Sequence, residues 1–108
     1  LNAPAAGLDE LILRLSSDAP GARRVAILDL IALSTRDRRA GAALESHLPH
    51  EHDERAALLI IRHLASAGRR AAMPRLLAMY HNRETPVAIA HAAILAHDVL
   101  AGMSAPGP

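Results

Sequence analysis

The chain carries one apolar pattern three times, at intervals that fit a pair of helices. The copies begin at Pro20, Glu51 and Pro86. Equivalent positions lie 31 residues apart between the first two copies and 35 apart between the last two, a mean of 33. They are Ala26, Ile27, Leu28, Leu30 and Leu33, then Ala57, Leu58, Leu59, Ile61 and Leu64, then Ala92, Ala93, Ile94, Ala96 and Val99. This period with helical spacing is typical of stacked helix pairs.

A second apolar series lies between these copies. Leu11, Leu44 and Leu77 follow one another at intervals of 33 residues, each inside an apolar helical stretch. We therefore expect all three leucines to be buried at equivalent places. Together the two series predict an all-α fold, a short right-handed α-solenoid of antiparallel helix pairs.

Six helices are predicted, at about 8–16, 20–33, 38–48, 53–66, 73–81 and 85–102. No useful stretch alternates polar and apolar residues with period two, so strands are not expected. Residues 1–7 and 102–108 are rich in Pro, Gly and Ala, and we expect them to be loose ends around one domain at 8–101. The short loops make consecutive helices antiparallel neighbours.

Proline, threonine and glycine mark the expected helix ends. Pro20 is expected in the first turn of the second helix, where its missing N–H costs nothing. Gly68 is expected to cap the C-terminus of the fourth helix. Thr85 is the expected N-cap of the last helix, with Pro86 at its first position.

Composition restricts both the core and the partners. Hydrophobic residues make up 51% of the chain, yet Tyr80 is the single Phe, Tyr or Trp. The core must therefore be aliphatic. Proteins that bind single-stranded nucleic acid gain about 1–3 kcal/mol for each base that stacks on an aromatic side chain. This chain has almost no aromatic side chains that could provide such stacking. Twelve basic and eleven acidic residues give a net charge of +1, so polyanions are not attracted. No nucleic-acid partner is expected.

Compartment and membrane attachment are only weakly constrained. There is no cysteine, hence no disulfide or thiolate metal site. No apolar run approaches the roughly 20 residues that span a bilayer, so no membrane partner is expected. Leu1 is not an initiator methionine, which indicates a processed product, a tag remnant or a domain of a longer protein. We place the chain in the cytoplasm.

Three segments resemble HEAT-like repeats, most closely the short variety of phycobilisome-lyase-type proteins. The first helix of such a repeat is similar to PGARRVAILDLIAL (20–33) and PVAIAHAAILA (86–96), and the second helix to MPRLLAMY (73–80). The resemblance covers about residues 8–101. It implies two full repeats between two half repeats, with alternate helices in two layers. The layer of second-type helices is usually the concave one that faces a partner.

One candidate binding site lies on that layer. Arg14, His47 and Tyr80 are 33 residues apart on successive second-type helices. On a concave face they would form a ridge of cation, imidazole and phenol, and Tyr and Arg are enriched at interface hot spots. The alternative is that each side chain lies at the edge of a core stripe and covers apolar surface with its stem.

A metal site is the competing hypothesis for the densest polar segment. His47, His50 and His52 surround Glu51, and imidazole with carboxylate is a ligand set for Zn, Ni or Cu. Exposure in a turn is the simpler explanation, because no spacing here is as diagnostic as a four-ligand zinc motif. The iron-binding HEAT-like hydroxylase of deoxyhypusine carries His-Glu inside its first helices. The corresponding pairs here are Arg24-Val25, Arg55-Ala56 and Ala90-His91, so that iron site is not expected.

The remaining charged groups have ordinary structural explanations. Asp18, Glu51 and Glu84 precede the first-type helices at intervals of 33 and suit helix N-termini. His91 and His97 are about 120° apart on the last helix and are expected to be solvated or to face a partner. Arginines gather in two equivalent turns and suggest a solvated edge. They are Arg36, Arg38, Arg39, Arg69 and Arg70.

The sequence thus predicts a non-catalytic protein-interaction module, an adaptor or regulatory domain that could belong to a larger assembly. No catalytic motif is present, and no cofactor is expected. One alternative, implied only by the resemblance, is an accessory protein that handles a tetrapyrrole or bilin. The other is a histidine-based metal-binding protein. Self-association or packing against the rest of a longer chain is expected through the small residues Ala92, Ala93 and Ala96.

Overall fold

The computed structural model describes residues 7–103, and this part of the chain is entirely helical, without strands. The helices are α1 (Leu8–Arg14), α2 (Pro20–Ser34), α3 (Arg38–His47), α4 (Glu54–Ser66), α5 (Met73–His81) and α6 (Val87–Gly102). Two 3-10 turns, η1 (Leu48–His50) and η2 (Arg70–Ala72), precede α4 and α5. The predicted all-α class is confirmed. The expected loose ends lie outside the described residues, except for Gly7, Gly102 and Met103.

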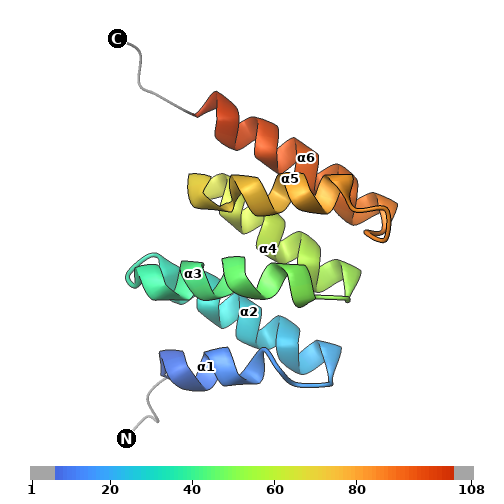
Figure 1. Cartoon of the computed structure of the whole chain (residues 1–108). Coiled ribbons are helices and arrows are strands. Elements are labelled where there is room, and N and C mark those ends of the chain that lie inside the picture. The colour runs from blue at the N-terminus through green and yellow to red at the C-terminus, as the bar shows by residue number, and fades with distance from the viewer. Residues whose placement is uncertain (1–6, 104–108) are drawn as a thin grey trace, which may run out of the picture.

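Consecutive helices run antiparallel and alternate between two layers (Figure 1). The odd-numbered helices α1, α3 and α5 share one layer and one direction, and α2, α4 and α6 form the other. Within the second layer α4 packs against both α2 and α6, while α5 and α6 form an extensive hairpin contact. The alternation of layers is as expected. The right-handed superhelix and the HEAT-like family stay predictions.

An aliphatic core lies between the two layers. Every hydrophobic side chain in it comes from Leu, Ile or Ala, as the scarcity of aromatic residues requires. Its largest fully buried members are Ile27, Leu30, Leu44, Leu48, Ile60, Ile61, Leu64, Leu76 and Leu100. Burial of one such side chain contributes about 1.5–3 kcal/mol, so this core supplies most of the driving force for folding.

Most positions of the two apolar series are buried or half-buried, as predicted, but three of them are exposed. Leu11 and Leu44 are buried, but Leu77 is 37% exposed and Leu76 occupies the core instead. A shift of one residue turns a side chain by about 100° around a helix, so a 33-residue interval does not keep its phase through every loop. Leu28 and Val99, both placed on apolar stripes, are each 51% exposed.

The small residues of α6 do not form the expected surface. Ala93 and Ala96 belong to the core and Ala92 packs against it. A partner cannot reach Ala93 and Ala96, so these residues are not the contact surface that was expected, whereas self-association through the last helix stays a prediction. Burial here is a consequence of size: α6 approaches α4 and α5 closely because its inner side chains are small.

Helix ends follow the expected chemistry with one exception. α2 begins at Pro20 as predicted. Gly68 follows α4 with φ of 69°, in the left-handed region, and the Arg69 N–H bonds the Leu64 carbonyl as in a Schellman motif. The N-cap of α6 is Pro86 and not Thr85, because Pro86 has an extended backbone (ψ 144°) and the helix begins only at Val87.

Within residues 7–103, none of the helices combines the length and the apolar character that crossing a bilayer requires.

Replacing Leu44 by Ala should lower the free energy of unfolding by about 2–5 kcal/mol, because it opens a cavity at a fully buried site. Leu77→Ala is the matched control, the same change one repeat later at an exposed site, and should cost about 0.5 kcal/mol or less. Urea denaturation followed by circular dichroism measures both. If both variants lost the same free energy of unfolding, Leu77 would be buried, and the rotation of α5 that exposes it would be contradicted.

Candidate functional site

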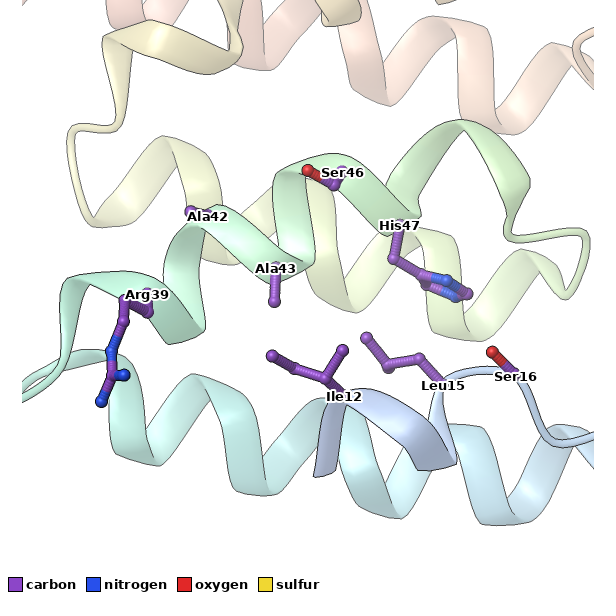
Figure 2. A pocket seen from close by; sticks show the side chains of 8 residues that line it. All are labelled: Ile12, Leu15, Ser16, Arg39, Ala42, Ala43, Ser46 and His47. Carbon is purple, nitrogen blue, oxygen red and sulfur yellow. The ribbon is translucent and has the colours of Figure 1, made fainter. Parts of the chain in front are cut away.

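A groove lies between α1 and α3 on the odd-helix layer (Figure 2). Its volume is about 450 Å³, within the range of roughly 300–1,000 Å³ seen for ligand sites. The lining residues are Ile12, Leu15, Ser16, Arg39, Ala42, Ala43, Ser46 and His47. Figure 2 shows Ile12 and Leu15 of α1 directed toward α3, with Ala43 opposite them. The groove exists because α3 presents alanines where larger side chains would fill the space.

One further hollow adjoins this groove, and a second adjoins that hollow. The first, of about 320 Å³, shares Leu15, Ser16 and His47 with it. Its other lining residues are Ser17, Arg23, His50 and His52. The second, of about 350 Å³, shares His52 and is lined mainly by η1, α5 and the start of α6. The three hollows therefore lie next to one another in a row, from the groove at α1 to the hollow at the start of α6.

The structure brings His47, His50 and His52 to one hollow but not to one metal site. All three line the 320 Å³ hollow. Nevertheless, the described part of the chain contains no group of three or more His, Asp or Glu side chains placed to hold a metal ion. The His47 ring already bonds Glu51, with Nε2 2.8 Å from Oε1. The histidines therefore line a surface and are not arranged as a coordination shell.

Glu51 is the centre of a buried polar network beneath this hollow. Its side chain is completely inaccessible. The Arg23 guanidinium of α2 donates to both carboxylate oxygens, with Nε and Nη2 3.0–3.2 Å from them. The Asp53 backbone N–H donates to Oε2 at 2.9 Å. Arg23 also donates to the Ser17 carbonyl at 2.7 Å. One carboxylate thus joins the α1–α2 loop, α2, α3 and the start of α4.

The network keeps Glu51 ionised despite its burial. Burial by itself raises the pKa of the carboxyl, but the hydrogen bonds from Arg23, His47 and the Asp53 backbone outweigh it. The pKa of Glu51 therefore lies below its ordinary value of 4.5. The hydrogen bond to Glu51 in turn raises the pKa of Arg23. This pairing satisfies the rule that a buried charge needs a bonded counter-charge.

Arg14, His47 and Tyr80 lie on α1, α3 and α5 and differ in exposure and in bonding partners. Arg14 lies on the exposed surface of α1 and pairs with Glu10 at 3.1 Å. Tyr80 is 43% exposed on α5, where its ring meets His81 edge to face. His47 differs from both, since its side chain is mostly covered and bonded to Glu51. Among the three, His47 is the member that lines the groove.

A second buried carboxylate, Glu45 of α3, was not predicted. It bonds Nε of Arg69, from the loop after α4, and lies 3.9 Å from Nη1 of Arg75. Gly41 makes this contact possible: a Cβ there would lie 2.6 Å from the Arg69 guanidinium. An acidic residue next to Leu44 and a glycine inside a helix were the sequence signals that could have revealed it.

The contact between Ser34 and His63 is structural. Ser34 Oγ is 2.9 Å from His63 Nε2, joining the ends of α2 and α4. The hydroxyl donates to the Ile31 carbonyl at 2.7 Å, so it accepts from the imidazole. The ring then carries its proton on Nε2 and cannot act as a base toward Ser34. Burial, followed by the charge of Arg69, lowers the pKa of His63.

The other charged candidates are largely solvated. Asp18 and Glu84 are exposed, whereas Glu51, grouped with them in the sequence, is the buried ion-pair partner of Arg23. Glu51 also accepts the N–H of Asp53, the N-cap of α4, at 2.9 Å, so it lies at the helix terminus as expected, and its burial and its ion pair with Arg23 were not predicted. Asp53 caps α4 by accepting the Ala56 N–H at 3.0 Å. Arg69 does not belong to the predicted solvated edge of arginines, because its side chain bonds the buried Glu45.

No family model, curated protein or solved structure matches the chain. The family assignment therefore depends on the quoted sequence segments alone.

Replacing Glu51 by Gln should cost about 3–5 kcal/mol in the free energy of unfolding at pH 7, because it leaves the Arg23 charge covered without its partner. Glu84→Gln, the same change at an exposed acidic residue 33 positions later, is the control and should cost about 0.5 kcal/mol or less. Denaturant titration by circular dichroism measures both.

The same network predicts how the wild type responds to acid. Because the folded pKa of Glu51 lies below the ordinary 4.5, its stabilisation is complete above that pH and is lost as the pH falls through the folded value. Glu51→Gln should lack this acid-dependent loss of stability, which in the wild type begins as the pH falls below about 4.5. Parallel acid profiles for both proteins would show that Glu51 is not a stabilising carboxylate.

Gly41→Ala should destabilise by about 1–3 kcal/mol, because the new methyl group displaces Arg69 and leaves Glu45 without its closest counter-charge. Gly21→Ala in α2 is the control: its Cβ would meet one Arg24 atom at 3.9 Å, so it should be neutral or stabilise by up to about 1 kcal/mol. Thermal melts distinguish the two. A Gly41→Ala protein as stable as wild type would show that Arg69 moves aside freely.

Proposed function

We propose that this chain is a non-catalytic, HEAT-like protein-interaction module that binds an extended segment of a partner protein. One observation carries the proposal: three hollows adjoin along the molecule and share residues at their boundaries. A small ligand needs one enclosed pocket, whereas a row of adjoining shallow hollows suits a chain. A cytoplasmic location and an adaptor or regulatory role belong to the same proposal.

The lining suggests the chemistry of the bound segment. The groove and the hollow next to it contain Arg23, Arg39 and three histidines, but no acidic side chain. Arg23 and His47 already bond Glu51, so the charge of Arg23 is partly compensated and the His47 ring is already engaged. The apolar floor of Ile12 and Leu15 would hold an aliphatic side chain. The segment we propose combines such an anchor with a carboxylate directed toward His50 and His52.

The two alternative functions receive less support. No Tyr, Phe or Trp lines any of these three hollows, so they offer no aromatic surface for the ring system of a tetrapyrrole. The metal hypothesis has the shared hollow of His47, His50 and His52 in its favour, but one of these rings is engaged by Glu51.

A displayed library of random 12-residue peptides, selected on the immobilised wild-type chain, tests the proposal. Enriched peptides should bind Ile12→Asp at least tenfold more weakly in calorimetric titration, because a carboxylate replaces the apolar floor. Leu77→Asp is the matched control: Leu77 is 37% exposed and Ile12 38%, but Leu77 lines none of the three hollows. Its affinity should equal that of wild type.

Circular dichroism confirms that both variants fold before the titrations are compared. A selection that enriches no peptide, or peptides that lose affinity equally with both variants, would refute the proposed groove.

A further inference from the structure

A ridge of residues four apart, which winds around α6, carries a row of exposed apolar side chains. Val87, Leu95, Val99 and Met103 are 77%, 64%, 51% and 53% exposed, and His91 completes a series with a spacing of four residues. Residues four apart form one of the continuous ridges of a helix surface. Four of the ten large hydrophobic side chains that are exposed within residues 7–103 thus gather on this one ridge.

Within residues 7–103 the middle of this ridge, around Leu95, is largely uncovered, whereas Met103 at its end reaches Gly68: a Cβ at Gly68 would lie 3.6 Å from Met103 Cε. α4 and α5 pack against the opposite side of α6, where Ile89, Ala93, Ala96 and Leu100 are buried. The exposed residues of α6 include one formal charge, Asp98. By comparison, α4 exposes Glu54, Arg55 and Arg62 on its outer surface. The outer face of α6 is therefore both more apolar and less charged than that of its neighbour.

The ridge is complementary to itself when reversed. In an antiparallel copy placed across a two-fold axis at Leu95, His91 lies next to Val99 of the other chain. Asp98, adjacent in sequence to Val99, then lies beside His91 of the other chain. The one charged group of this face thereby gains an imidazole partner, in addition to its own His97 at 3.4 Å. No like charges are brought together.

We propose that a second copy of this chain packs against this ridge, α6 on α6, as a two-fold dimer. Two-fold interfaces are the commonest in soluble oligomers because each patch meets an identical patch. Ridges of residues four apart interdigitate at a crossing angle of about −50°, and the small Ala88 and Gly102 beside the ridge allow close approach. One helix pair buries less than the roughly 1,200–2,000 Å² of a standard interface, so the dimer dissociates on dilution.

Sedimentation velocity over a hundredfold range of concentration tests the dimer. The wild type should pass from monomer to dimer, and Leu95→Glu should stay monomeric, because two carboxylates would meet on the axis. Leu28→Glu is the matched control, a Leu that is 51% exposed on α2, and should dimerise like wild type. A wild type that is monomeric throughout, or one whose dimer is disrupted by Leu28→Glu and not by Leu95→Glu, overturns the proposal.

A cross-link tests the position of the axis. The chain contains no cysteine, so Leu95→Cys introduces one thiol per copy, close to its symmetry mate. Under mild oxidation it should form an interchain disulfide at least tenfold faster than Val25→Cys, a control that is 55% exposed on α2. Equal rates overturn the proposed axis. If Leu95→Cys stays reduced and the wild type is monomeric, the ridge does not bind a second copy.

Discussion

The ion pair between Glu51 and Arg23 is the interaction on which the N-terminal half of the molecule depends. A buried carboxylate is tolerated only where donors replace its water, and here they come from three different segments: Arg23 on α2, His47 on α3 and the backbone of Asp53. Because Arg23 also bonds the loop after α1, the carboxylate holds both walls of the α1–α3 groove. The orientation of His47 at the end of that groove follows from the same bond.

A second pair repeats this principle farther along the chain. Glu45 on α3 bonds Arg69 in the loop before α5, and Gly41 supplies the space. The two carboxylates lie six residues apart around the C-terminal end of α3 and engage opposite neighbours, α2 on one side and the loop after α4 on the other. α3 is therefore held on both sides by ion pairs, which are directional. The apolar contacts of the aliphatic core also hold it, but these contacts are not directional.

The surfaces that remain after these contacts fall into two groups. The hollows follow the odd-numbered helices, where alanines and short loops leave space between side chains. The apolar ridge lies on α6, the last helix of the described residues. Binding in the hollows and pairing through the ridge use different faces. A dimer would leave both grooves free and could bind a partner with two suitable segments more tightly than a monomer.

The sequence by itself determined the helical class, the six helices and most of the core, since 3.6-residue periodicity and helix-end residues such as Pro20 and Gly68 act locally. It did not determine which of Leu76 and Leu77 is buried, because that depends on the phase of α5 after a loop. Nor did it show that Glu51 and Glu45 are buried or that Ala93 and Ala96 face inward. Tertiary structure decided these points, because the partners Arg23 and Arg69 are 28 and 24 residues distant from their carboxylates, and only the packing of α2, α3 and α4 brings them together.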